Sequence, residues 1–320
     1  MMSQFNEHEL AMISWAFATA GMKHSESELF HEIAAAAMPR MGEFNEQDLA
    51  MSAWAFATAG TKQAESELLH GLAAAAVPRI GKFKEQELAM TAWAFAKAGV
   101  SHSELFCALS TTALPRIGKF TSQGLPNLVW AFASVAWSDP ELFNAVASEA
   151  LLRISEFTYQ GLSNLAWAFV RADLIPPRKA TQLLEAIAVR ARQQNWSVLQ
   201  AASGPPSLSA VEARCAELVL RWIPGSTRNR YFMGFELDIV FEVEDGRLIN
   251  LEIDEPYHRT PKQSALDARR DGFLKQCGVC AVRFVAFDES GPLREDREEP
   301  ALQALLRYTR LLPTSPSERK

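Results

Sequence analysis

Acidic residues recur at alternate positions in two short apolar stretches toward the C-terminal end of the chain. Asp238 lies between Leu237 and Ile239, and Glu252 and Asp254 flank Ile253. This period of two is typical of β-strands and places the carboxylates of each stretch on one face. Carboxylate oxygens are the ligands that hard divalent cations prefer, so these residues are candidates for a Mg²⁺ or Mn²⁺ site.

The turn between the two stretches determines which carboxylates meet. Apolar residues of both strands share a face only if the turn consists of Glu244, Asp245 and Gly246, which pairs Asp238 with Glu252. Like charges opposite one another are destabilising and call for a cation. A divalent metal is one solution, and nearby basic groups are another. A solvated acidic face without a function remains the alternative. The nearby basic candidates are His258, Lys262, Arg269 and Arg270.

Three of these basic residues belong to one expected helix, 261–276. Lys262, Arg269 and Arg270 are separated by about two helical turns and fall near one helix face. We expect this face to contact phosphate groups of a nucleic acid, or else to be a solvated face balanced by the acids.

A second set of polar residues recurs in the first two thirds of the chain, where the sequence repeats itself. The motif Trp-Ala-Phe occurs five times, 37 to 39 residues apart, and a phenylalanine precedes each tryptophan by ten residues. Five such units exceed the three or so that a stable stack of repeats needs. The tryptophans are Trp15, Trp54, Trp93, Trp130 and Trp167.

Each unit is expected to form two helices. The first helix ends near a glycine in the first three repeats, and the second opens at a capping box such as Ser25 to Glu28, Ser101 to Glu104 or Ser138 to Glu141. Apolar residues on two sides of the first helix indicate that it is packed between neighbours, as in a solenoid. The tryptophans, surrounded by alanine and phenylalanine, are expected in the core.

One stripe of the first helix is less apolar. Two interpretations stand: a hydrogen-bond ladder between stacked helices, or a row of side chains that read RNA bases, one set per repeat. The more polar members lie in the fourth and fifth repeats, which makes Gln123, Asn127, Gln160, Asn164 and Arg171 the candidate RNA-binding residues. The other members are His8, Met12, Thr19, Gln47, Met51, Thr58, Gln86, Met90, Lys97 and Ser134.

The pattern changes after residue 192. We expect a repeat array over 1–192, a linker over 193–209, an α/β domain over 210–312 and a disordered tail over 313–320. Within the domain we expect helices over 210–222, 261–276 and 300–311, and a third strand over 279–287. The fold class is therefore multidomain: an all-α solenoid of helical hairpins followed by a small α/β domain.

Composition limits the function classes. The chain has 320 residues, is 48% hydrophobic and carries a net charge of −6, with a pI near 5.6. That charge excludes a protein held to nucleic acid mainly by bulk positive charge. No apolar run approaches the ~20 residues of a transmembrane helix, so no membrane partner is expected. No targeting segment is visible at the N-terminus, and we expect preceding sequence to be missing.

The C-terminal residues resemble a known domain. Phe-Glu-Leu-Asp238-Ile-Val-Phe, Leu-Glu252-Ile-Asp254-Glu-Pro-Tyr-His258 and Asp267-Ala-Arg-Arg-Asp271 are similar to the RAP domain, the RNA-binding domain abundant in apicomplexans. The Trp-Ala-Phe units resemble the octotricopeptide and FAST-kinase-family repeats that accompany it. The resemblance implies a restriction-endonuclease-like, PD-(D/E)XK fold. It further implies binding of single-stranded organellar transcripts or ribosomal RNA, a mitochondrial or chloroplast location and other RNA-processing proteins as partners.

The resemblance also assigns roles to the carboxylates. In nuclease relatives, the counterparts of Asp238 and Glu252 hold a divalent metal that activates water. Here Asp254 stands where that pattern has lysine, and Glu255 stands where the RAP pattern has glycine. Loss of the lysine removes a transition-state cation and favours binding without cleavage. The prediction is an organellar RNA-binding protein. The alternatives are a metal-dependent endoribonuclease using Asp238, Glu252 and Asp254, and a protein–protein scaffold.

Overall fold

The structure is a computed structural model that divides into two compact units, Met1–Leu184 and Glu185–Lys320. It describes residues 2–23, 28–60, 67–172, 178–194, 196, 200–201, 210–243, 246–254, 260–288, 291–293, 295–309 and 311. Most of the predicted linker and all of the predicted tail lie outside these residues, so the domain bounds stay predictions. None of the helices in the described segments is long and apolar enough to cross a membrane.

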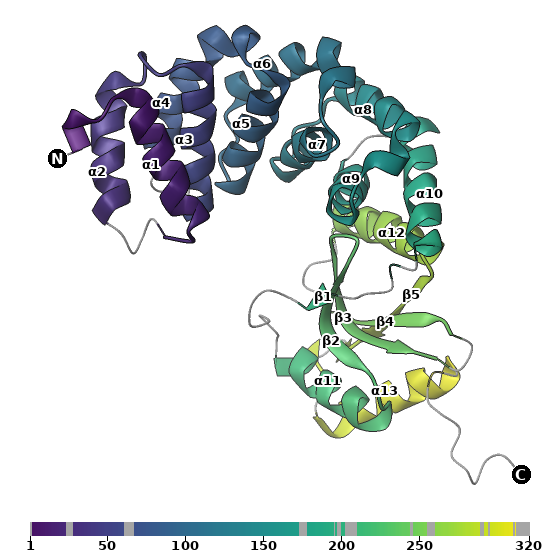
Figure 1. The fold of residues 1–320 in the computed structure, drawn as a ribbon. Coiled ribbons are helices and arrows are strands. Elements are labelled where there is room, and N and C mark those ends of the chain that lie inside the picture. Colours follow the sequence, from purple (N-terminus) through teal and green to yellow (C-terminus); the bar gives the residue numbers. More distant parts are fainter. Residues whose placement is uncertain are drawn as a thin grey trace, which may run out of the picture. The chain divides into compact units, whose positions relative to one another are not determined.

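The first unit is a row of helical hairpins, as predicted (Figure 1). Its first helices pack against one another in sequence order. They are α1 (Glu7–Thr19), α3 (Glu46–Ala59), α5 (Glu85–Lys97), α7 (Gly124–Ser134) and α9 (Tyr159–Arg171). The second helices are α2 (Glu28–Ala37), α4 (Glu67–Ala76), α6 (Ser103–Ala113), α8 (Pro140–Leu152) and α10 (Arg178–Gln193), and the boundary between the two units falls within α10.

Short 3-10 turns link one repeat to the next. They are η3 (Met38–Arg40), η5 (Val77–Lys82), η6 (Leu114–Lys119) and η7 (Ile154–Glu156), and a similar turn, η1 (Met2–Gln4), precedes α1. Proline opens the turns η3, η5 and η6, where its missing N–H and fixed φ end the preceding α-helix. The proline of each of these turns thus ends the second helix of its repeat.

The predicted helix ends hold, but two of the predicted caps are wrong. Gly60 has φ 95° and closes α3, a backbone conformation that favours glycine. The cap of α6 is His102, whose Nδ1 accepts from the Leu105 N–H, and that of α8 is Asp139, which accepts from the Leu142 N–H. Pro140 at the first position of α8 makes its predecessor the cap, displacing Ser138. Ser25 lies outside the described residues.

Small and aromatic residues hold successive repeats together. The alanine of each Trp-Ala-Phe motif from the second repeat onward is fully buried between neighbouring first helices. The phenylalanine of the motif packs edge-to-face against a phenylalanine from the second helix of the preceding repeat, as in Phe30–Phe56, Phe106–Phe132 and Phe143–Phe169, with ring centroids 5.2–5.4 Å apart. The motif therefore encodes the stacking of the array.

The second unit contains a five-stranded sheet in the order β1-β2-β3-β4-β5. All neighbours are antiparallel except β4 and β5, which are parallel. The strands are β1 (Gln200–Ala201), β2 (Thr227–Phe232), β3 (Phe235–Glu242), β4 (Leu248–Asp254) and β5 (Val279–Val285). A separate pair joins β6 (Phe287–Asp288) to β7 (Gly291–Pro292).

Most of the predicted elements of this unit are present. Helices α11 (Ala210–Trp222) and α12 (Pro261–Gln276) have the predicted bounds, whereas α13 (Glu295–Tyr308) begins before the predicted Pro300. Proline favours a first turn, but here it lies in the second turn of a helix that has already begun. Strand β2 was not predicted, because Thr-Arg-Asn-Arg-Tyr-Phe has no alternating apolar pattern.

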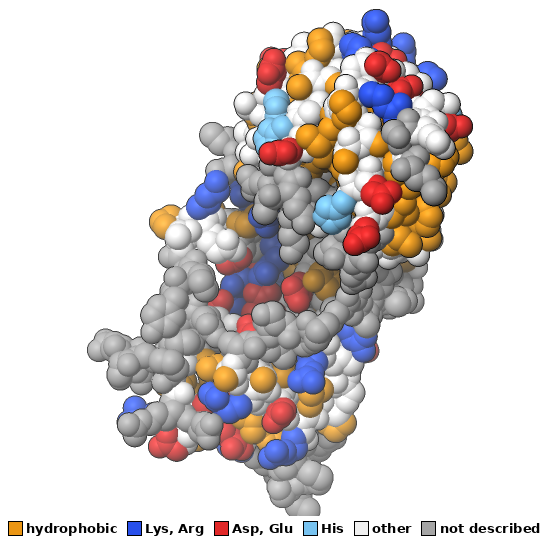
Figure 2. Space-filling view, turned by 90° about the vertical axis from the view of Figure 1, so that its left-hand side faces the viewer, with side chains coloured by type: hydrophobic (Ala, Val, Ile, Leu, Met, Phe, Trp, Pro, Cys, Tyr) orange, Lys and Arg blue, Asp and Glu red, His pale blue; other side chains and the backbone are white. Residues whose placement is uncertain are grey.

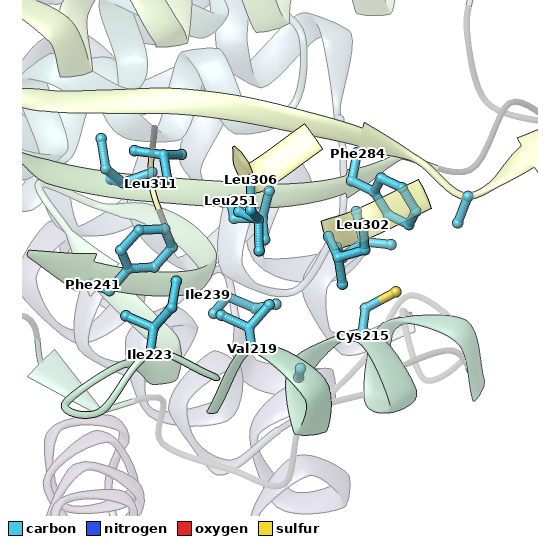
Figure 3. Close-up of a cluster of buried hydrophobic side chains, with 14 of the residues drawn as sticks. Cys215, Val219, Ile223, Ile239, Phe241, Leu251, Phe284, Leu302, Leu306 and Leu311 are labelled. Atoms are coloured by element: carbon cyan, nitrogen blue, oxygen red, sulfur yellow. The ribbon is translucent and has the colours of Figure 1, made fainter. Parts of the chain in front are cut away.

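The predicted register of the hairpin is confirmed. Ile239 lies opposite Leu251 and Phe241 opposite Ile249, so the apolar side chains share one face. That face packs with Cys215 and Val219 of α11 and Leu302 of α13 in a continuous core (Figure 3). Helix α12 lies on the opposite face of the sheet (Figure 1). Arg270 of this helix binds the Glu252 carboxylate of β4. A small α/β unit is thus present, and its identity with the PD-(D/E)XK fold stays a prediction.

Candidate nucleic-acid interface

The predicted polar stripe and the tryptophans lie on the same face of the first helices. Positions seven and three residues before each tryptophan, and four after it, fall on one helical face with the tryptophan itself. We call this row of four residues per repeat, from α1 to α9, the tryptophan stripe. In the third repeat it consists of Gln86, Met90, Trp93 and Lys97.

The tryptophans form a ladder at the surface rather than part of the core. Successive ring centroids are 6.4, 6.3, 6.5 and 5.9 Å apart, with interplanar angles of 28–38°. Trp15 is 42% exposed and the other four rings are half-buried. The expectation of core tryptophans was therefore wrong. The small alanines around them are buried between helices, whereas each indole lies over its neighbour and keeps part of its face in solvent.

Figure 2 views the α1–α2 end of this unit and shows hydrophobic side chains at its surface among charged ones. The large exposed hydrophobic residues of that end include Met12, Trp15, Met22 and Met38. Trp15 is the most exposed ring of the ladder because only one neighbouring first helix, α3, packs beside it.

The polar members of the stripe bond to one another in the last two repeats. Gln160 Nε2 donates to Asn164 Oδ1 at 2.9 Å, and Asn164 Nδ2 donates to Asn127 Oδ1 at 3.2 Å across the α7–α9 boundary. This is the hydrogen-bond ladder of the first interpretation. Gln160 is exposed and both asparagines are half-buried, so their remaining amide groups face the surface. In these residues, a hydrogen-bond ladder between helices is therefore compatible with side chains that read RNA bases.

Two cations occupy the last stripe position of their helices, one in the third repeat and one in the fifth. Lys97 is exposed on α5, and Arg171 of α9 places its guanidinium carbon 4.8 Å from the centroid of the Trp167 ring. A guanidinium over an indole is a favourable cation–π contact that leaves its N–H groups available at the edge. Gln123, the remaining predicted residue, is exposed directly before α7.

A second recurring feature was missed by the sequence reasoning. The arginine that follows the proline of each linking turn donates to the carbonyl of the phenylalanine that opens the same repeat. These contacts are Arg40 to Phe5, Arg79 to Phe44, Arg116 to Phe83 and Arg153 to Phe120, at 2.7–3.0 Å. We call them the arginine clamps. Arg153 follows a leucine rather than a proline. Each clamp arginine stands four residues before the phenylalanine that opens the next repeat, and this constant spacing was the available signal.

On the sheet of the second unit, the predicted carboxylates do gather, but with arginines. Glu252 accepts from Asn250 Nδ2 at 2.8 Å and from Arg270 of α12. Arg283 of β5 lies opposite Glu252 in the register, with Nη2 3.5 Å from that carboxylate and Nη1 3.6 Å from Asp254. Arg283 also donates to Asp271. The single charge in the strand Val-Cys-Ala-Val-Arg-Phe-Val was the signal for this residue.

Asp238 is bound differently. Its Oδ2 accepts from the backbone N–H of Ile253 at 3.1 Å. Burial, followed by the nearby charge of Glu252, raises the pKa of Asp238 to about 7. Burial also raises the pKa of Glu252, while the guanidinium groups of Arg270 and Arg283 oppose that shift. The two carboxylates thus lie near shared positive charge, and the arginines contact Glu252 rather than Asp238.

Other predicted site residues are dispersed. On α12, Lys262 is exposed and Arg269 is half-buried, whereas Arg270 is committed to Glu252 and Asp271. His258 lies outside the described residues. Within the described segments, no three His, Cys, Asp or Glu side chains form a group that could hold a metal ion. The predicted metal site at Asp238 and Glu252 and the predicted catalytic set with Asp254 stay predictions.

The stacked hairpins and the tryptophan ladder define the first unit as an array of helical repeats. A family model described as RNA-editing substrate-binding complex 6 protein matches residues 1–205, and the chain belongs to that family. The match covers the whole array and ends before the carboxylates, so the resemblance to the RAP domain stays a prediction. Among curated proteins, no match to the chain was found.

Proposed function

We propose that this chain binds single-stranded RNA along the tryptophan stripe and acts in RNA processing. The observation that carries the proposal is the continuous row of five partly exposed indoles, interleaved with amides and accompanied by Lys97 in the third repeat and Arg171 in the fifth. The family name, with its RNA-editing substrate-binding complex, supports the same substrate class.

The chemistry of the stripe suits unpaired bases. Single-stranded RNA is recognised by stacking on aromatic rings and by hydrogen bonds to base edges, with cations for the backbone. Each repeat presents one indole. The fourth and fifth repeats add the amides of Asn127, Gln160 and Asn164 and the guanidinium of Arg171. We therefore assign base contacts to these two repeats first, with Gln123 at their edge.

The finer parts of the function belong to the same proposal. The RNA would be a mitochondrial or chloroplast transcript or ribosomal RNA, and other RNA-processing proteins would be partners. Lys262 and Arg269, together with His258, would contribute phosphate contacts from the second unit. Glu252 takes a structural role in this proposal, because Arg270 and Asn250 already bind its oxygens. That arrangement favours binding over metal-dependent cleavage.

The test replaces Asn127, Asn164 and Arg171 with alanine together. Removing both asparagines takes away a donor and its acceptor at once, which is nearly neutral for stability. The affinity for a labelled single-stranded RNA, measured by fluorescence anisotropy, should fall on the order of tenfold or more, since a hydrogen bond contributes about 0.5–1.5 kcal/mol and one from a charged group about 1.5–3 kcal/mol.

The matched control replaces three exposed polar residues of α10, Arg178, Thr181 and Gln182, with alanine. Circular dichroism checks that both variants keep the helical content of the parent. Equal RNA affinity of the two variants, at equal folded fraction, would refute the stripe as the interface. Crosslinking of RNA to peptides of α5, α7 and α9 provides an independent measurement, and crosslinks confined to the second unit would contradict the proposal.

A further inference from the structure

We propose that the turns η5 and η6 form a phosphate-binding edge beside the tryptophan stripe, and that this edge holds the backbone of RNA whose bases lie on the stripe. The inference rests on the proposed function and adds the path of the RNA backbone. We call the edge the central basic edge. It consists of Arg79 and Lys82 of η5, Lys84 directly before α5, and Arg116 and Lys119 of η6.

The arginines of this edge lack the acidic partners of their counterparts. In the flanking repeats, Arg40 is 3.1 Å from Glu7, and Arg153 is 2.9 Å from Glu156 and 3.3 Å from Glu149. Across the described segments of the chain, neither Arg79 nor Arg116 has a carboxylate oxygen within 4.0 Å. Their contacts are carbonyl oxygens, which leave the positive charge uncancelled.

The lysines follow the same distribution. The residue directly before the opening phenylalanine is Lys82 and Lys119 in the central turns, but Glu43 and Glu156 in the turns on either side. Lys82, Lys84 and Lys119 are all exposed. In a chain of net charge −6, five basic residues are therefore gathered at two consecutive turns, where the acidic neighbours are Glu85 and Glu87 beside Lys84 and Glu149 beside Gly118. A local patch of this kind is what an acidic protein needs to hold a polyanion.

The edge leads along the chain into the proposed base-binding row. Lys82 and Lys119 each precede by four residues the first stripe position of the following helix, Gln86 and Gln123. Helix α7 has no acidic residue in its first turn, so the positive end of its dipole is not offset there. Phosphates on the edge would thus lie beside bases on the stripe, which separates backbone positioning from base contacts.

The first experiment replaces Lys82, Lys84 and Lys119 with glutamine and measures oligouridylate binding over a series of KCl concentrations. Loss of three phosphate contacts should reduce the slope of log K against log salt by roughly 2, since each contact to a single strand contributes about 0.7. The control replaces the exposed Lys23, Arg178 and Arg221 with glutamine, which removes the same charge elsewhere. Identical slopes and affinities in the two variants would overturn the inference.

A second pair of variants tests the same edge with residue types that equivalent turns of the fold already accommodate. Lys82→Glu with Lys119→Glu introduces the residue that the flanking turns already carry, and it should weaken binding more than the glutamine variant. Glu43→Lys extends the edge by one turn and should steepen the salt slope. Absence of both effects would overturn the inference.

The outcomes separate this inference from the function on which it rests. Failure of the parent protein to bind oligouridylate would refute the proposed function itself. Binding that depends on Asn127, Asn164 and Arg171, but not on the three lysines, would refute only the central basic edge. Polyglutamate that competes as well as oligouridylate at equal charge would show a site for acidic polypeptides and overturn the assignment to RNA.

Discussion

Arginine stabilises both units of this protein, but through different partners. In the array, four arginine clamps donate to main-chain carbonyls, one in each of the first four repeats, at 2.7–3.0 Å. In the sheet unit, Arg270 and Arg283 bind the carboxylates of Glu252, Asp254 and Asp271. The clamps satisfy main-chain carbonyl groups, which are present whatever side chain stands at that position. The sheet arginines offset charges that particular strand residues introduce.

The difference predicts different costs of mutation. A clamp lies at the edge of the array, where water can replace a lost hydrogen bond in part. Glu252 is buried, with 8% of its side chain exposed, and water cannot replace its arginines without opening the layer between α12 and the sheet. Buried ion pairs are strongly destabilised when one partner is removed, because the other is left as an uncompensated charge.

The largest expected effect is therefore that of Glu252→Gln. We expect loss of about 3 kcal/mol of stability in the sheet unit, because Arg270 and Arg283 would lose the buried carboxylate that they share, while Asp271 still binds both. Hydrogen exchange of peptides from β3 and β4 in the full chain measures it without interference from the array. Glu242→Gln, an exposed position at the end of β3, is the control. Equal protection in both variants would show that the network contributes little.

The clamp is tested by Arg116→Ala, which removes bonds to the carbonyls of Phe83 and Gly81, both 2.8 Å. We expect a loss of about 2 kcal/mol in urea unfolding followed by tryptophan fluorescence. Arg116→Lys should recover only part of it, because an ammonium lacks the planar fork that reaches two carbonyls. If Arg116→Ala is as stable as Arg178→Ala, an exposed arginine change in α10, the clamp has no energetic role.

The smallest effect concerns the ionisation of Asp238. Its pKa is raised to about 7 in the folded chain, while the unfolded residue titrates near 3.8. Between pH 8 and pH 6 only the folded state takes up this proton, so lowering the pH over that range stabilises the fold, by about 1 kcal/mol.

Asp238→Asn should abolish this pH dependence and stabilise the unit at pH 8, because the amide oxygen can still accept from the Ile253 N–H. Thermal melts of parent and variant at pH 6 and pH 8 give the comparison. A variant whose melting temperature changes with pH as much as that of the parent would show that another group titrates.

The sequence alone determined the array and the hairpin. Trp-Ala-Phe at intervals of 37 to 39 residues predicted stacked helix pairs, because a solenoid repeats one local unit. Alternating apolar residues and the Glu-Asp-Gly turn predicted the register that Ile239 opposite Leu251 confirms. Both features depend on residues close in sequence, where periodicity carries the information.

Tertiary structure decided the rest. Exposure of the indoles depends on how neighbouring first helices lie side by side, which a pattern within one helix cannot show. The partner of Glu252 is Arg283 because β4 and β5 pair in parallel across the crossover helix α12, and no local rule sets that register. The arginine clamps join residues 33 to 35 positions apart. In each case the deciding contact lies between segments distant in sequence, whose side chains meet only after the backbone has packed.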